Sequence, residues 1–201
     1  MPESIVQVTS GGGPKLHTWQ RTIGANNVED ELVLPGEHYV ASYVVTSGSV
    51  ALATANSHLL QIMAGASLNV RIRRIYIAQA SVTTSLAHFQ IQLVRLTTAG
   101  TGGTGATPGK FDTADAASGA TGMTLPTAKG TESTILTNYA MVVTNAATIG
   151  EMPYVYTFGD NVSKPLVIPA GTANGLAIKN VSSQAAGGVY INVEFTETSF
   201  L

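Results

Sequence analysis

Few residues of this 201-residue chain have the side-chain chemistry that catalysis needs, and those few are scattered. The chain has no cysteine, which excludes thiol nucleophiles, disulfides and thiolate metal sites. No two of the four histidines stand at the spacing of metal ligands: His17, His38, His58 and His88. Serines are common, but none lies in the G-x-S-x-G turn of a hydrolase. We therefore expect no enzyme activity, and we assign no catalytic, cofactor-binding or metal-binding residue.

Two aspartates form the one pair that invites a metal hypothesis. Asp112 and Asp115 flank a dipeptide within a long loop and could share a hard cation such as calcium. The simpler interpretation is that their carboxylates bond to nearby backbone N–H groups and shape the loop. We favour this second interpretation.

The glycine-rich segment Gly100–Gly105 matches G-x-G-x-x-G and follows a predicted strand. A dinucleotide site also needs a helix directly afterwards and a carboxylate about 20 residues further on, and neither is present. Gly109-Lys110 resembles part of a phosphate loop, but Phe111 stands where serine or threonine is required. Neither motif predicts a nucleotide site.

Four of the ten basic residues group on two strand-like segments: Arg71, Arg73, Arg74 and Arg95. Such a cluster could bind an acidic patch of a partner, because guanidinium groups bind carboxylates with two hydrogen bonds. The alternative is a solvated strand face whose arginines pair with Glu194 or Glu197. The sequence alone slightly favours the alternative.

The composition bounds the class of protein. Charged residues make up 11% of the chain, against about 25% in an average soluble domain. Because charge keeps free monomers soluble, this low fraction favours a subunit that lives inside an assembly. The net charge of −2 argues against nucleic acid as a partner.

Membrane association and secretion are not expected either. No apolar run approaches the roughly 20 residues that cross a bilayer. Met1–Ser4 shows neither the basic nor the apolar region of a signal peptide. Without one, the glycosylation patterns at Asn161 and Asn180 are interpreted as chance matches.

Alternating apolar residues predict an all-β body over residues 39–201. Val70 and Ile72 alternate with polar residues until Arg74, where the alternation slips by one residue, as at a β-bulge. Tyr39–Thr46 and Val50–Thr54 predict two strands around a turn at residues 47–49. Pro165–Val181 and Gly188–Thr196 predict a closing antiparallel meander. The fold class expected is an antiparallel β-sandwich, jelly-roll-like, with an extended N-terminal arm.

A common inner face is expected for a set of residues on three of these strands. The set is Val70, Ile72, Ile91, Leu93, Ile191, Val193 and Phe195.

Two segments do not resemble domain interior: the arm at residues 1–38 and a low-complexity loop at residues 98–132. Each carries isolated large side chains that could anchor it on a neighbouring subunit. Together with two of the arginines they form our candidate partner interface: Leu16, Trp19, Ile23, Arg71, Arg73, Phe111 and Met123.

A series of motifs resembles a family of tailed-bacteriophage virion proteins. In chain order they are His58–Gly65 (HLLQIMAG), Arg73–Ile75 (RRI), Gln92–Gly103 (QLVRLTTAGTGG), Asp112–Asp115 (DTAD), Leu125–Glu132 (LPTAKGTE) and Ile168–Gly171 (IPAG). The resemblance covers most of the chain after about Ser57 and leaves the arm outside. It implies a β-sandwich subunit of the virion, of the capsid decoration or cement type, made in the host cytoplasm.

The partners that this resemblance implies are the major capsid protein or other virion subunits, and further copies of the chain, with a trimer as our guess. The alternative from another class is a glycan- or receptor-binding module of the particle. That alternative needs exposed tryptophan or tyrosine near carboxylates, and the aromatic fraction is only 6%.

Overall fold

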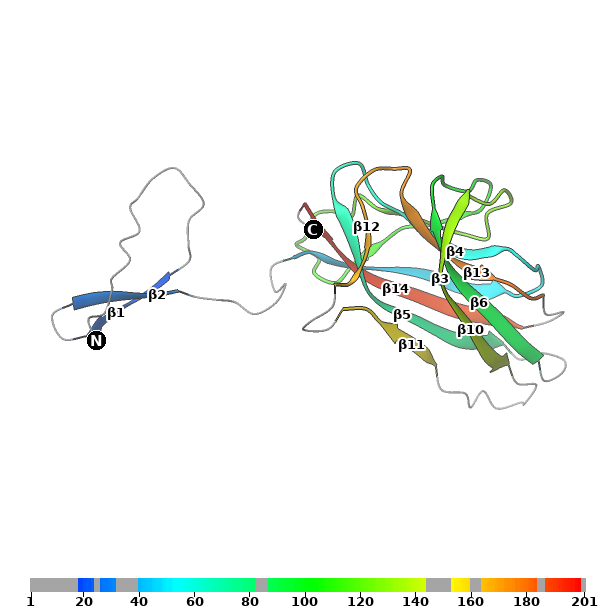
Figure 1. Ribbon diagram of the computed structural model, residues 1–201, viewed down its shortest axis with the longest axis horizontal. Coiled ribbons are helices and arrows are strands. Elements are labelled where there is room, and N and C mark those ends of the chain that lie inside the picture. The colour runs from blue at the N-terminus through cyan, green and yellow to red at the C-terminus, as the bar shows by residue number, and fades with distance from the viewer. Residues whose placement is uncertain are drawn as a thin grey trace. The chain divides into compact units, whose positions relative to one another are not determined.

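The computed structural model describes residues 18–23, 26–31, 40–81, 87–143, 153–159, 164–183 and 187–199 (Figure 1). The chain divides into two compact units, Met1–Tyr39 and Val40–Leu201. The division lies one residue beyond the arm boundary proposed from the sequence. No helix of the described part is long and apolar enough to cross a membrane.

The first unit contains a strand pair within the segment expected to be an arm. Strand β1 (Thr18–Ile23) runs antiparallel to β2 (Asn26–Glu31), with Thr18 opposite Glu31 and Ile23 opposite Asn26. The acidic end of β2 therefore lies beside the start of β1.

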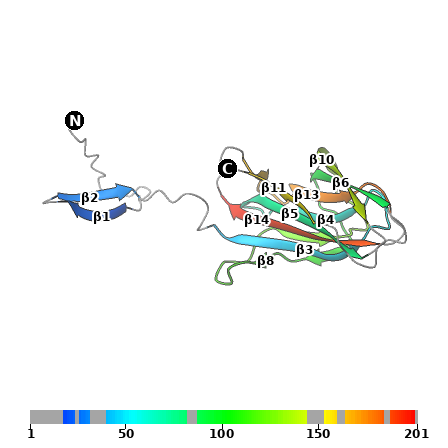
Figure 2. The same ribbon diagram turned by 90° about the horizontal axis from the view of Figure 1, so that it is seen from below.

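The second unit, here called the body, is built from two antiparallel sheets (Figures 1 and 2). Sheet I has the order β10 (Glu132–Val143), β6 (Ala87–Leu96), β13 (Gly175–Asn180), β4 (His58–Met63), β9 (Thr121–Thr124), β7 (Thr104–Ala106). Sheet II has the order β11 (Tyr154–Thr157), β5 (Asn69–Ser81), β14 (Gly188–Thr198), β3 (Ser42–Ala51), β8 (Gly109–Lys110). A further strand, β12 (Leu166–Ile168), also pairs with β5. The all-β class and the two-sheet sandwich expected from the sequence are confirmed.

The long strands pair from the outside of the sequence inwards. The first strand of the body, β3, pairs with the last, β14, and β4 pairs with β13. Next, β5 pairs with β11 and β12, and β6 pairs with β10. Successive strands from β3 to β6 alternate between the two sheets, so that most ladder partners are far apart in sequence.

The core lies between the sheets and holds every residue expected there. Val70, Ile72, Ile91, Leu93, Ile191, Val193 and Phe195 all belong to one cluster of buried side chains. Phe195 stacks on Tyr43 of the neighbouring strand, with ring centroids 5.5 Å apart. The alternation in the sequence therefore identified the inner face correctly.

The slip at Arg74 is a β-bulge, as predicted. Opposite β14, Ile72 pairs with Phe195 and Arg74 pairs with Glu194, so that Arg73 is the extra residue. The side chains of Arg73 and Arg74 both lie outside the core, whereas Ile75 is buried in it.

Two other expectations about strands are wrong. Residues 42–51 form one strand, and the predicted turn is a second bulge, in which Gly48 has φ +62° and the Ser47 hydroxyl accepts the Ile191 N–H at 2.9 Å. The closing strands β13 and β14 are not a meander, because they lie in different sheets. The cause is the same in both cases: alternation identifies a buried face, but it does not identify a partner strand.

The long loop between β6 and β10 is ordered on its own body. Strand β9 extends sheet I beside β4, whereas β8 extends sheet II beside β3. Gly100 donates its N–H to the buried Gln61 side chain at 3.1 Å. The expectation that this loop lies mainly on neighbouring subunits is therefore wrong for its backbone, much of which pairs within the body.

Candidate functional site

The proposed interface residues are not brought together. Arg71 and Arg73 lie two residues apart on β5, partly buried. Phe111 follows β8 at the opposite edge of sheet II, and Met123 lies on β9 of sheet I. Trp19 and Ile23 lie on β1, where the structure describes the backbone alone, and Leu16 lies outside the described residues.

The arginine cluster divides between the two sheets. The Arg74 guanidinium donates two hydrogen bonds to the Glu194 carboxylate, at 3.1 Å and 2.7 Å. These bonds raise the pKa of the guanidinium. Arg95 lies on β6 in the other sheet and donates to the Val167 carbonyl. The alternative interpretation, an arginine paired on a strand face, is confirmed for Arg74 and Glu194.

Glu197, the other expected partner for arginine, has a different role. Its carboxylate accepts the backbone N–H groups of Gly119 at 3.0 Å and Ala120 at 2.8 Å, and the Ser118 hydroxyl at 3.0 Å. These bonds hold the loop against β14, and their donors belong to the loop and not to the arginine cluster. A loop 77 residues away in sequence supplies these donors, so spacing could not reveal it.

The two loop aspartates shape the loop, as favoured above. The Asp112 carboxylate accepts the Ala114 N–H at 2.9 Å, and its carbonyl accepts the Asp115 N–H at 3.1 Å. Lys110 donates to the carbonyls of Thr113 and Asp115. Across the described residues, no three histidine or carboxylate side chains gather as metal ligands do.

The glycine-rich segment also has a structural explanation. A Cβ on Gly103 would lie 2.4 Å from the Thr124 carbonyl oxygen, and one on Gly100 would lie 2.7 Å from the Ala128 carbonyl oxygen. Gly102 has φ +73°, a conformation that side chains disfavour. The glycines allow the loop to pack closely against residues 124–128.

One partly buried cluster of charged and titratable groups was not predicted. The Glu132 carboxylate binds Lys179 at 2.8 Å, Lys129 at 3.0 Å and the fully buried His58 ring at 3.1 Å. Burial raises the pKa of Glu132, but the hydrogen bonds from Lys179, Lys129 and His58 outweigh burial and lower it to about 2. Burial lowers the pKa of His58. The cluster joins the end of the loop to β4 and β13.

A row of aromatic side chains lies where the two sheets meet, along β10 and β11. The Tyr139 and Tyr154 rings stack at 3.8 Å, and the row continues through Tyr156 to Phe158. Tyr139 lies on the outermost strand of sheet I and remains 37% exposed. This row closes the core on one side while leaving apolar surface at its rim.

The outer strand β10 exposes further apolar side chains. Ile135 is 51% exposed and Leu136 is 39% exposed. No charged residue stands between Glu132 and Glu151 in the sequence, which is the one signal that could have indicated this surface. We call Ile135, Leu136 and Tyr139, with the backbone of Glu132–Val143, the β10 edge.

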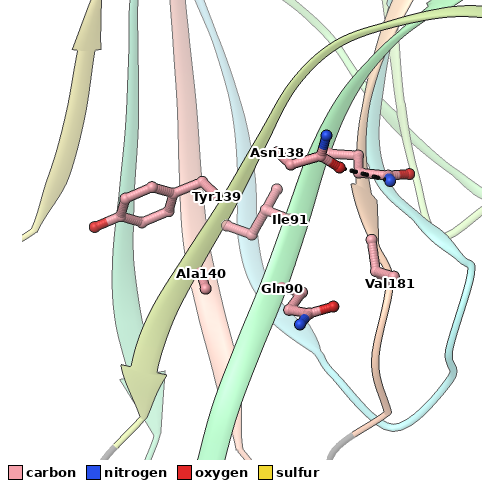
Figure 3. Close-up of a pocket in the computed structure, with 7 residues that line it drawn as sticks. Gln90, Ile91, Asn138, Tyr139, Ala140 and Val181 are labelled. Atoms are coloured by element: carbon pink, nitrogen blue, oxygen red, sulfur yellow. Dashed lines mark hydrogen bonds between the residues drawn. The ribbon is translucent and has the colours of Figure 1, made fainter.

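A shallow depression of about 260 Å³ lies beside the β10 edge (Figure 3). Its polar side chains are amides, with Gln92 donating to Asn138 at 2.7 Å. Figure 3 shows the Tyr139 ring on the other side of β10 from this amide pair. Tyr139 is among the lining residues and no carboxylate is, so the depression does not match the sugar platform that the alternative function requires.

Comparisons of the chain with known families, with curated proteins and with solved structures find no match. The function is therefore argued from the geometry of the described residues.

Proposed function

We propose that this protein is a structural subunit that binds the outside of a phage capsid and stabilises or decorates it. The observation that carries the proposal is a charge-poor chain whose body exposes large apolar side chains away from the β10 edge, Phe111 at 60% and Leu125 at 40%. Exposed apolar surface of this kind is typical of proteins that bury it against a partner. The resemblance to tailed-phage virion proteins suggests that the assembly to which the subunit binds is a phage particle.

The strand order supports the same proposal. Pairing first strand with last, second with second-last and so on resembles the winding of a jelly roll, and we propose that the body has this fold, which is common among capsid and lectin domains. Fold alone does not define function, and so this order adds to the argument without carrying it.

Chemistry of the enzymatic kind finds no support in the described residues. The motifs weighed for metal or nucleotide chemistry have structural roles: Asp112 caps a turn, and the glycines allow close packing. The glycan-binding alternative is less favoured, because the Tyr139 ring points away from the amides of this depression and no carboxylate lines it.

The first unit is a candidate attachment element. Acidic residues outnumber basic ones in residues 1–39: Glu3, Glu29, Asp30, Glu31 and Glu37 against Lys15 and Arg21. A separate compact unit can bind a partner without disturbing the core of the body.

The test is a re-binding assay on phage particles stripped of the protein. Deleting residues 1–36 should leave a body that melts near the temperature of the full chain but binds particles much more weakly. Unchanged binding of the truncated body would remove the attachment role of the first unit. A full chain that is absent from purified particles, and does not bind stripped ones, would refute the proposed function itself.

A further inference from the structure

We propose that the β10 edge pairs, antiparallel and across a two-fold axis, with the β10 edge of a second copy of this chain. The edge strand of a sheet leaves backbone N–H and C=O groups without ladder partners, and these can template another strand. Proteins protect such edges with short strands, charged side chains or proline.

Three of the four described sheet edges of the body are formed by short strands. β7 has three residues, β8 has two, and β11 and β12, which share the edge beside β5, have four and three. The fourth, β10, has twelve, and no described residue pairs with its free side. One long edge among three short ones marks the place where another strand can add.

A β-bulge also protects an edge, but the register shifts of β10 lie only at its start, between Glu132 and Ile135 and between Ile135 and Thr137. The proposed pairing uses the regular remainder, Thr137–Val143, whose composition gives no protection. From Ser133 to Val143 the strand has no charge, proline or glycine. The single carboxylate at its start, Glu132, is already bound by two lysines and a histidine. Ile135, Leu136 and Tyr139 present apolar surface at the same edge.

Charge decides which strand fits there. The β1–β2 pair carries Glu29, Asp30 and Glu31 next to one another, and the β10 edge has no free cation to compensate them. Burying those carboxylates against it would cost free energy. A second β10 is uncharged along the same length, and so it meets this edge without an unpaired charge.

The pairing is self-consistent at the level of residues. An isologous contact places residue i against j and residue j against i. With Ala140 on the axis, Asn138 lies opposite Val142 of the second copy, and these positions stay within Thr137–Val143, where the register of β10 on β6 is regular. Such a contact makes dimers, whereas the trimer guessed from the resemblance would need a head-to-tail contact.

A gatekeeper substitution tests the pairing in the full chain. Ala140→Lys places two like charges beside each other on the axis, at an exposed position of β10, and should weaken self-association, measured by sedimentation, at least about tenfold. Tyr190→Lys is the matched control, since Tyr190 is 45% exposed on a central strand, β14, and should leave self-association unchanged. Thermal melts of both variants establish that the body remains folded.

Cysteine crosslinking can determine the register between the two β10 strands. Introduced cysteines report on it without interference, because the natural chain has no cysteine. Ala140→Cys should form a disulfide between copies, and a mixture of Asn138→Cys with Val142→Cys should give the crosslinked heterodimer. Directly paired antiparallel residues have Cα atoms about 4.5–5.5 Å apart, which suits a disulfide.

Three results would overturn the inference: a chain that is monomeric up to its solubility limit, a trimer, or a self-associated chain in which none of these positions crosslinks. Self-association is measured without particles, so its failure is distinct from that of the proposed function. If the chain dimerises but does not bind particles, this inference is supported and the proposed capsid function is refuted.

Discussion

Replacing Phe195 by alanine removes the side chain at the centre of the sandwich. Phe195 is 1% exposed on β14, faces Ile72 in register and stacks on Tyr43. Truncation of a buried phenylalanine costs about 3–5 kcal/mol through lost burial and the cavity left behind. The aromatic pair accounts for about 0.5–1.5 kcal/mol of that cost.

The assay is urea unfolding of the full chain with a thermal melt alongside. For a body of this size, each kcal/mol corresponds to about 2–4 °C in Tm, so the melt should fall by roughly 6–20 °C. The control is Tyr190→Ala on the same strand, whose exposed side chain should change the free energy of unfolding by about 0.5 kcal/mol or less. Equal losses in the two variants, or a loss below about 1 kcal/mol for Phe195→Ala, would refute the assignment of the inner face.

Two further predictions concern the loop and its anchor. Glu132 has a folded pKa of about 2, below its ordinary value of 4.5, so its contribution is complete above pH 4.5 and is lost as pH falls towards 2. Acid titration of stability should therefore be flatter over that window in Glu132→Gln, which should also cost about 1–3 kcal/mol near neutral pH. Glu194→Gln removes the partner of the half-exposed Arg74 and should cost less, because water screens an exposed ion pair. Equal costs in the two variants would contradict this role for Glu132. Gly103→Ala should destabilise the body by about 1–3 kcal/mol because its Cβ meets the Thr124 carbonyl, whereas Gly105→Ala has open space around it and should be neutral in the same melts. A neutral Gly103→Ala would show that the glycine there is not a packing requirement.

The sequence by itself determined which side of most strands is buried. Side chains alternate along a strand, so Val70 with Ile72, and Ile191 with Val193, had to face one layer whatever their neighbours were. The break in that period also identified the bulge at Arg73, because an extra residue reverses the alternation. These properties are local, and a local pattern is sufficient to predict them.

The pairing of strands was decided only by the tertiary structure. Alternation does not say that β3 lies beside β14, or that β13 and β14 belong to different sheets, since those neighbours depend on how the chain winds. The same holds for the sites: the donors to Glu197 come from a distant loop, and Tyr139 meets Tyr154 across two sheets. The β10 edge itself exists because β10 is outermost in its sheet, a position that no local pattern records, although its lack of charge was already visible in the sequence.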